Sequence, residues 1–453
     1  MCEGVVLVVV VWLKLNELMQ WLPDFNTNVV LAGSVLLGVA CGLVGTFTIL
    51  RGRSLMADAL AHAALPGVCI AFLITGSREL GPLLAGALAF GVAGVLAVMG
   101  IRRVSRVKED AAIALVLSTT FGLGVALLSK VQRMPTGAHA GLEGFIFGKA
   151  ASMVVRDVQL IAIVAAIVVV LCTVFYRQFK VLCFDREFAQ SAGLRVHLLD
   201  FMLMALVCVA TVVALPAVGL VLVVALLTIP GAAARCWSDR LGVMAGLSAV
   251  FGAAAGAIGT GISATQPRLS AGPVITLVAA TLFLVSLFGA PRRGVLARWL
   301  RERGLRRKIA IQNVLRAVYE VTESQAGTSA AIAEIALKRA WSRAELDALL
   351  VRARREGFIT RDGDRVALTT EGREHAQGIV RTHRLWELYL VTYASIATDH
   401  VDRDADTIEH VLPAHIIAEL EARLREDGRL PAALAVPASP HAVAPHSRAG
   451  VHE

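Results

Sequence analysis

Residues 201–226 read FMLMALVCVATVVALPAVGLVLVVAL and contain no charged side chain. Such a run is typical of a membrane protein, since about 20 apolar residues in a helix cross the hydrocarbon core of a bilayer. Comparable stretches recur on both sides of it, and they are continuous rather than alternating, which excludes β-barrel strands. The sequence therefore predicts an all-α polytopic membrane protein with about nine transmembrane helices, near residues 28–50, 57–75, 81–100, 111–129, 157–176, 196–213, 216–236, 241–262 and 271–289.

Charged residues are distributed unevenly along the chain. Of its 453 residues, 56% are hydrophobic and 17% are charged, whereas an ordinary soluble domain carries about 25% charged residues. Residues 1–290 hold 19 Lys and Arg and 13 Asp and Glu, and residues 291–453 hold 25 and 22. This division excludes a purely soluble or a disordered chain. It predicts an N-terminal extension (1–26), a transmembrane domain (27–290) and then a soluble block. Whether residues 4–22 also cross the membrane stays open, because their apolar run is short.

Basic side chains gather in alternate loops of the predicted membrane domain. Arg51 and Arg53 follow the first span, and Arg102 and Arg103 follow the third. Because cytoplasmic loops of membrane proteins carry an excess of Lys and Arg, these loops and the whole soluble block are expected in the cytoplasm. Residues 291–308 are then a basic juxtamembrane linker that contacts anionic membrane lipid.

Two ionisable side chains lie inside the second apolar stretch. Asp58 and His62 are four residues apart and share one face of the predicted helix. A carboxylate and an imidazole in an apolar helix are costly unless they are paired or functional. Together they offer one oxygen and one nitrogen ligand to a divalent transition metal ion. A structural pair that satisfies itself explains them equally well.

Two further segments interrupt the apolar pattern. The loop 184–194 reads FDREFAQSAGL and predicts a short amphipathic helix closed by Gly193. Such a helix is either inert at the membrane surface or docks a soluble partner. Pro230, in the stretch 228–231, is expected to kink or end the seventh transmembrane helix.

Three motifs in this order resemble the permease subunits of ABC importers for manganese, zinc and iron. They are LRGRSLMADALAHAALPG (50–67), the loop from Asp185 to Gly193, and LTIPGAAAR (227–235). The resemblance covers about residues 27–290 and implies a type II importer fold in the bacterial plasma (inner) membrane. It also implies a second permease subunit, identical or different, and an extracytoplasmic metal-binding protein.

The resemblance assigns roles to residues as well. It implies that Asp58 and His62 line the metal path. It implies that an ABC ATPase is coupled through a helix that contains Phe184, Asp185, Glu187, Ala189 and Gly193. The chain has no GxxxxGK[ST] phosphate-binding motif. We therefore expect that it is not an enzyme and has no catalytic residues, and that a separate ATPase subunit hydrolyses ATP.

The soluble block begins with the pattern of a winged-helix domain, residues 309–373. Apolar spacing predicts helices at 309–324, 330–339 and 342–356, and Asp362-Gly363 within 357–369 predicts a β-hairpin. A long helix from Glu371 to about Tyr393 leads into a helical domain over 374–428. The tail 429–453 is rich in Pro and Ala and is expected to be disordered.

Carboxylates and imidazoles recur at helical spacing in the domain 374–428. Such sets have metal-ligand chemistry, although surface ion pairs explain either set alone. Following a winged helix, RTHRLWE (381–387) and DTIEH (406–410) resemble the metal-dependent regulators of the diphtheria-toxin-repressor type. The resemblance implies regulatory manganese, iron or zinc ligands at His383, Glu387, Asp406, Glu409 and His410, and at His400 only with an offset of two residues. Asp406 stands where that family has Cys or Glu, and Asn313 stands where it has a Met or Asp ligand.

Two functions are compatible with these features. The first is an importer permease for a divalent transition metal, manganese or iron before zinc, with a C-terminal metal-sensing or dimerising domain. The alternative is a membrane-tethered, metal-dependent transcription regulator. DNA binding is not expected, because DNA phosphates attract basic side chains, whereas residues 309–453 carry 17 basic and 21 acidic ones. The third predicted helix also begins with two acids, Glu345 and Asp347.

Overall fold

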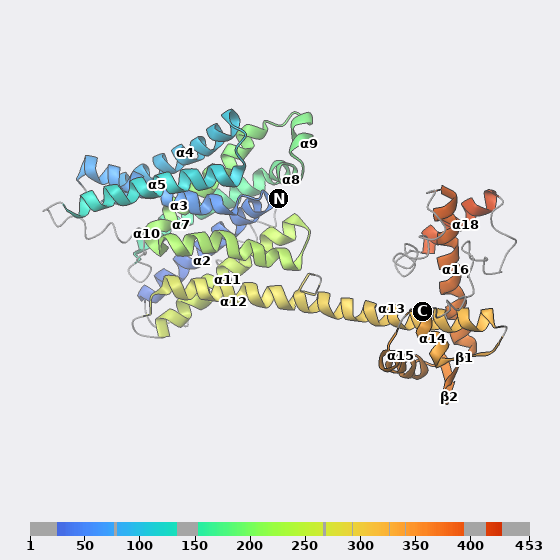
Figure 1. Ribbon diagram of the computed structural model, residues 1–453. Helices are drawn as coiled ribbons and strands as arrows, with labels where there is room; N and C mark the ends of the chain where they lie inside the picture. Colours follow the sequence, from blue (N-terminus) through green and yellow to red (C-terminus); the bar gives the residue numbers. More distant parts are fainter. Residues whose placement is uncertain are drawn as a thin grey trace, which may run out of the picture. The chain divides into compact units, whose positions relative to one another are not determined.

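The chain forms two compact units, Met1–Arg298 and Trp299–Glu453. The computed structural model describes residues 25–76, 79–133, 153–265, 269–291, 293–325, 327–339, 341–393 and 414–427. Residues 4–22 and the predicted tail 429–453 lie outside the described residues. Both units are built mainly of helices (Figure 1).

The first unit is a bundle of long apolar helices (Figure 1). Among the described residues, eight helices are long and apolar enough to cross a bilayer. Seven of them each contain one predicted span, and the eighth, α10, contains two. The prediction of a polytopic helical membrane protein is confirmed. The eight are α2 (Phe25–Leu50), α3 (Ser54–Thr75), α4 (Leu80–Val104), α5 (Glu109–Gln132), α7 (Val155–Val174), α10 (Val196–Trp237), α11 (Leu241–Thr265) and α12 (Ala271–Gly289).

Helix α10 reverses its direction at Gly219. Both Asp200 and Gly231 contact the same end of α2. Asp200 Oδ1 lies 3.1 Å from Arg51 Nη2, and a Cβ built on Gly231 would lie 3.4 Å from Thr46 Cα. A straight helix would hold Asp200 and Gly231 about 46 Å apart at 1.5 Å per residue. The two halves of α10, 196–218 and 220–237, are therefore antiparallel, and among the described residues nine segments have the length of a span, the number predicted.

The backbone of Gly219 makes this reversal possible. Its φ of 78° and ψ of 170° belong to a region that is essentially restricted to glycine. The sequence pattern placed the boundary between the two spans at residues 214–215, five residues too early. Of the two alternatives expected at Pro230, a kink or an end, the helix does not end there, because α10 continues through Pro230 to Trp237.

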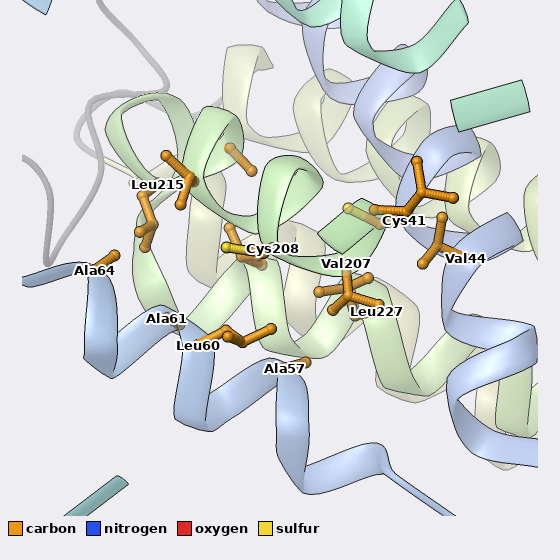
Figure 2. Packing of buried hydrophobic residues seen from close by; sticks show 14 of the residues in the cluster. Cys41, Val44, Ala57, Leu60, Ala61, Ala64, Val207, Cys208, Leu215 and Leu227 are labelled. Carbon is orange, nitrogen blue, oxygen red and sulfur yellow. The ribbon is translucent and has the colours of Figure 1, made fainter. Parts of the chain in front are cut away.

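Small residues bring the helices of this unit into close contact. A Cβ built on Gly38 of α2 would lie 2.2 Å from the carbonyl oxygen of Gly252 of α11, and the reverse distance is 2.1 Å. Such backbone contact between small residues is typical of helix association in lipid. Figure 2 shows buried side chains of α2, α3 and α10 in the core of the bundle, among them Cys41, Val44, Leu60, Val207 and Leu227.

The second unit contains a winged-helix arrangement, as the sequence predicted. Its three strands form an antiparallel sheet in the order β1-β3-β2, and Gly363, with a φ of 59°, lies in the turn of the β2–β3 hairpin. The elements are α13 (Val295–Ser324), β1 (Ser329–Ala331), α14 (Ile332–Lys338), α15 (Arg343–Arg355), β2 (Ile359–Asp362), β3 (Arg365–Leu368), α16 (Thr370–Tyr393) and α18 (Ala414–Glu426).

Two features of this unit differ from the prediction. Strand β1 was not expected, because three residues are too few to show an alternating pattern. Helix α13 begins at Val295 rather than at residue 309, so most of the predicted juxtamembrane linker is helical. The core, which includes Val314, Val318 and Val366, joins α13 to the sheet.

Candidate functional site

Asp58 and His62 lie on α3, one turn apart, as their spacing predicted. His62 Nε2 is 3.5 Å from Asp58 Oδ1, and their side chains are 19% and 34% exposed respectively. The sequence of α3 is otherwise apolar or small from Leu55 to Phe72. The pair is thus a carboxylate and an imidazole held together on a helix of a membrane bundle, and neither is fully covered by the chain itself.

Within the part of the chain that the structure describes, the second ring nitrogen of His62 has no hydrogen-bond partner. Nδ1 is buried and accepts or donates no hydrogen bond, while the ring lies edge-on to Phe121 of α5 with centroids 4.8 Å apart. A buried polar atom of this kind is costly unless something else binds it. Within the described residues no group of three or more His, Cys, Asp or Glu side chains is placed to hold a metal ion. The pair thus offers two donor atoms, one carboxylate oxygen and one imidazole nitrogen.

A buried ion-pair cluster lies just before the start of α3. Asp200 of α10 binds two arginines, with Oδ1 3.1 Å from Arg51 Nη2 and Oδ2 2.8 Å from Arg53 Nη2. Arg53 also contacts Glu109 of α5, and the other oxygen of Glu109 lies 2.7 Å from Arg102 Nη1 at the end of α4. The cluster thus ties the loop 51–53 to the ends of three other helices.

Sequence reasoning missed the roles of Asp200 and Glu109. It used Arg51, Arg53 and Arg102 only as markers of the cytoplasmic side. The signal that was available is an acid inside the sixth apolar stretch, since an intramembrane carboxylate usually has a partner. Its partners are 147 and 149 residues away in sequence, so spacing alone did not identify them.

The predicted coupling segment, residues 184–194, begins at the last residue of α8 (Tyr176–Phe184) and contains the whole of α9 (Arg186–Ser191). Asp185 caps α9, because its Oδ1 accepts a hydrogen bond from the amide of Phe188 at 2.8 Å. Gly193, with a φ of 78°, ends the segment. The amphipathic helix closed by glycine is therefore present at the predicted residues.

The exposed face of the coupling segment is apolar and acidic. Phe184 and Phe188 are 63% and 59% exposed, and Glu187 is exposed between them, whereas Ala189 is fully buried. Two exposed phenylalanines, one at the end of α8 and one on α9, offer a contact for another protein. Phe188 was not among the residues predicted for coupling, although it lies in the segment.

The coupling segment is connected to the ion-pair cluster. Arg51 donates a hydrogen bond from Nη1 to the backbone carbonyl of Leu182 in α8, at 3.0 Å. Leu182 is fully buried, so this contact fixes α8 against the loop that precedes α3. A displacement of α8 would therefore act on the residues next to the start of the helix that carries Asp58 and His62.

The predicted regulatory ligands divide into two groups. His383 and Glu387 of α16 are described and are 2% and 0% exposed, with His383 Nε2 3.1 Å from Glu387 Oε1. Arg316 of α13 also lies against the ring of His383, 3.0 Å from each ring nitrogen. His400, Asp406, Glu409 and His410 lie outside the described residues.

The membrane unit as a whole matches a known family. Residues 24–290 match the ABC 3 transport family. The chain belongs to this family. It is a multi-pass membrane protein of a family of transport permeases, which are not enzymes. Residues 369–432 match a second family, described as the iron dependent repressor, metal binding and dimerisation domain.

Several characterised relatives of the family are similar to the chain. The "Manganese transport system membrane protein MntC" of Bacillus subtilis (strain 168) is 37% identical over 407 residues, which cover 90% of this chain and 93% of the relative. The "Zinc transport system membrane protein TroC" of Treponema pallidum (strain Nichols) is 42% identical over 64% of this chain and 97% of its own length.

A solved structure resembles the membrane unit. "PsaBC from Streptococcus pneumoniae in complex with Fab" is 32% identical and has a TM-score of 0.54, with 64% of this chain and 99% of that chain covered. The helical bundle described above is thus the fold of the family. The expected family resemblances of both parts of the chain are confirmed.

Proposed function

We propose that this protein is the permease subunit of an ABC importer that moves a divalent transition metal ion into the cytoplasm, with manganese or iron favoured and zinc as a further candidate. The observation that carries the proposal is the Asp58–His62 pair, because its imidazole Nδ1 is buried without a partner on an otherwise apolar helix. One oxygen and one nitrogen donor suit these ions. The names of the relatives in Bacillus subtilis and Treponema pallidum, which specify manganese and zinc, support the same substrate class.

The proposed mechanism is alternating access rather than covalent catalysis. A metal ion passes between water and the Asp58–His62 pair, and the remaining ligands come from water or from a second permease subunit. We propose that an extracytoplasmic metal-binding protein delivers the ion. A cytoplasmic ABC ATPase docks on Phe184, Asp185, Glu187, Ala189 and Gly193 and supplies the energy, since the chain has no P-loop.

Uptake of manganese by cells that carry the complete transport system tests the metal path. With Asp58→Ala or His62→Ala, uptake should fall at least about tenfold, because even the loss of an outer-shell partner typically weakens metal binding by 10–100-fold. His197→Ala and Asp239→Asn are matched controls, since both side chains are exposed and uptake should stay normal. Unchanged uptake in the Asp58 and His62 variants, at equal protein level in the membrane, would rule out the path. Reconstituted transport with competing manganese, iron and zinc ions then identifies the substrate.

We propose that the protein lies in the bacterial inner membrane with the second unit in the cytoplasm. The first turns of α13 support an interfacial position. Trp299 is 44% exposed, and the guanidinium of Arg303 lies 3.4 Å from its ring centroid. Tryptophan and basic side chains together favour the boundary between lipid and cytoplasm.

The second unit is proposed to sense metal rather than to read DNA. In α15, the helix that a winged-helix protein would place on DNA, two charged side chains of the first two turns, Arg343 and Asp347, are already paired within the chain. Asp347 Oδ1 lies 2.7 Å from Arg361 Nη1, and Arg343 Nη2 lies 2.5 Å from Asp364 Oδ1. Of the predicted ligands we keep Asp406, Glu409 and His410 as the sensing set, with His400 as a further member, because His383 is already engaged with the buried Arg316 and Glu387 with His383.

A DNA-binding assay separates this proposal from the alternative of a tethered transcription regulator. The purified full chain in lipid nanodiscs should not bind promoter DNA of its own operon at low salt, with or without manganese. Metal-dependent binding that weakens steeply with salt would favour the tethered regulator instead.

A further inference from the structure

Arg316 is a buried cation at the centre of the second unit. It extends from α13, is 6% exposed, and lies against the imidazole of His383 on α16. Nη1 is 3.0 Å from His383 Nδ1, and Nη2 is 3.0 Å from His383 Nε2. Its Nε donates to Glu320 Oε1 at 2.6 Å. The contact joins two helices whose residues are 67 positions apart in sequence.

The hydrogen-bond partners of His383 decide which of its two ring nitrogens carries the proton. A guanidinium has donors only, so it needs an acceptor on the ring, and a neutral imidazole has one. The carboxylate of Glu387 accepts, so it needs the ring N–H, and it lies 3.1 Å from Nε2. The assignment that gives both an acceptor and a donor places the proton on Nε2, towards Glu387, and the lone pair on Nδ1, towards Arg316 Nη1. Arg316 Nη2, which lies 3.0 Å from Nε2, is then in contact with the ring without donating to it.

This assignment leaves no ligand for a metal ion on His383. A metal binds the lone pair of a neutral imidazole, and here that lone pair accepts a hydrogen bond from Arg316. Glu387 is fully buried, and a buried carboxylate requires a positive charge nearby. The guanidinium beside His383 provides one, and it would repel a divalent cation placed between His383 and Glu387. The residues at this pair therefore do not fit a bound metal.

We propose that Arg316 takes the place of a metal ion at the His383–Glu387 pair, and that the packing of α13 against α16 is held by this arginine without metal. The inference rests on the proposed metal-sensing role of the second unit. It limits the sensing ligands to Asp406, Glu409, His410 and His400, and it is independent of the proposed metal path. The pair binds metal only when Arg316 is removed.

Counting bound metal on the full chain tests this. The purified protein in detergent is stripped of metal and titrated with cobalt(II), and bound ions per chain are measured by absorbance and elemental analysis. The wild-type chain and His383→Ala should bind the same number of ions. Arg316→Met should bind one more, and the double variant Arg316→Met/His383→Ala should lose it again. Arg384→Met is the matched control, because Arg384 makes a different ion pair between the same two helices, 2.5 Å from Glu323, and its removal should add none.

Two results would overturn the proposal. One is a loss of one bound ion in His383→Ala or Glu387→Gln with Arg316 in place. The other is no gain in a folded Arg316→Met chain. A change in the number of bound ions that is seen only in His62→Ala concerns the transport proposal and does not bear on this inference.

Hydrogen exchange on the wild-type chain provides a test that does not depend on the Arg316 variant. Deuterium uptake by peptides from α16 is compared with excess manganese and with chelator. Any effect of metal on these peptides should be the same in the wild type and in His383→Ala. Protection by manganese that is seen in the wild type and lost in His383→Ala would contradict the proposal.

Discussion

Arg53, the residue before α3, donates a hydrogen bond from Nη2 to Oδ2 of Asp200 on α10 at 2.8 Å, and the two side chains are 4% and 3% exposed. Asp58 follows Arg53 by five residues. A charge pair that is buried to this degree links the beginning of the proposed metal-path helix to the helix that follows the coupling segment.

Asp200→Asn should destabilise the first unit strongly. It leaves Arg51 buried with a neutral partner and Arg53 with Glu109 as its remaining carboxylate, and removal of one member of a buried ion pair costs about 3–5 kcal/mol. Thermal unfolding of the purified protein in detergent should show a clearly lower midpoint. Asp239→Asn is the comparison, since Asp239 is 61% exposed in its pair with Arg293 and exposed pairs contribute about 0–1 kcal/mol. Equal midpoints for the two variants would contradict the role given to Asp200.

Phe188→Ala should impair coupling without affecting the fold. The side chain is 59% exposed, so the unfolding midpoint should stay close to that of the wild type, whereas co-purification of the ATPase and metal uptake should both decrease. Leu198→Ala, which removes a side chain that is 55% exposed outside the segment, should leave both unchanged. Normal ATPase binding by Phe188→Ala would remove this residue from the docking surface.

Gly219→Ala should destabilise the reversal of α10. A Cβ at a φ of 78° and a ψ of 170° is strained by about 1–3 kcal/mol. Gly246→Ala provides the control, because a Cβ at this position of α11 meets nothing within 4 Å. Thermal unfolding should show a lower midpoint for Gly219→Ala and no loss for Gly246→Ala. The opposite order would mean that the reversal does not depend on glycine.

Glu345→Gln should have an effect that depends on pH. Hydrogen bonds from the side chain and then the backbone of Ser342 lower the pKa of Glu345 below its ordinary value of 4.5. A carboxyl whose folded pKa is depressed adds stability above its unfolded pKa and loses it as the pH falls through the folded pKa. Urea unfolding of the full chain should therefore show a small loss of stability in the variant at pH 7, which disappears at pH values well below 4.5. A loss that persists at low pH would show that the charge is not its cause.

The sequence predicted the features that depend on local spacing. The Asp58–His62 contact follows from a separation of four residues on a helix, and the β2–β3 hairpin follows from Asp362-Gly363. Apolar length gave the number of spans, but Gly219 could not be distinguished from Pro216 as the point of reversal without the backbone angles.

Contacts between distant residues were not predictable from these patterns. Asp200 and Arg53 are 147 residues apart, and Arg316 and His383 are 67 apart, so no helical or strand period connects them. The pattern around His383 and Glu387 therefore indicated metal ligands, because the arginine that contacts them lies on another helix. The exposure of Phe188 was not predictable either, because it depends on which side of α9 packs against the rest of the unit.

The reversal at Gly219 has a consequence for biosynthesis. A single residue, Gly219, connects the two halves of α10. The connection is too short for the first half to span the bilayer while the second half remains in the translocation channel. Helix α10 contains a stretch with a mean hydropathy of 2.9, and residues 201–226, which lie on both sides of Gly219, carry no charge. The two halves must therefore partition into lipid as one helical hairpin. A charged substitution in either half would delay insertion of both, and Asp200 enters the membrane as part of that pair.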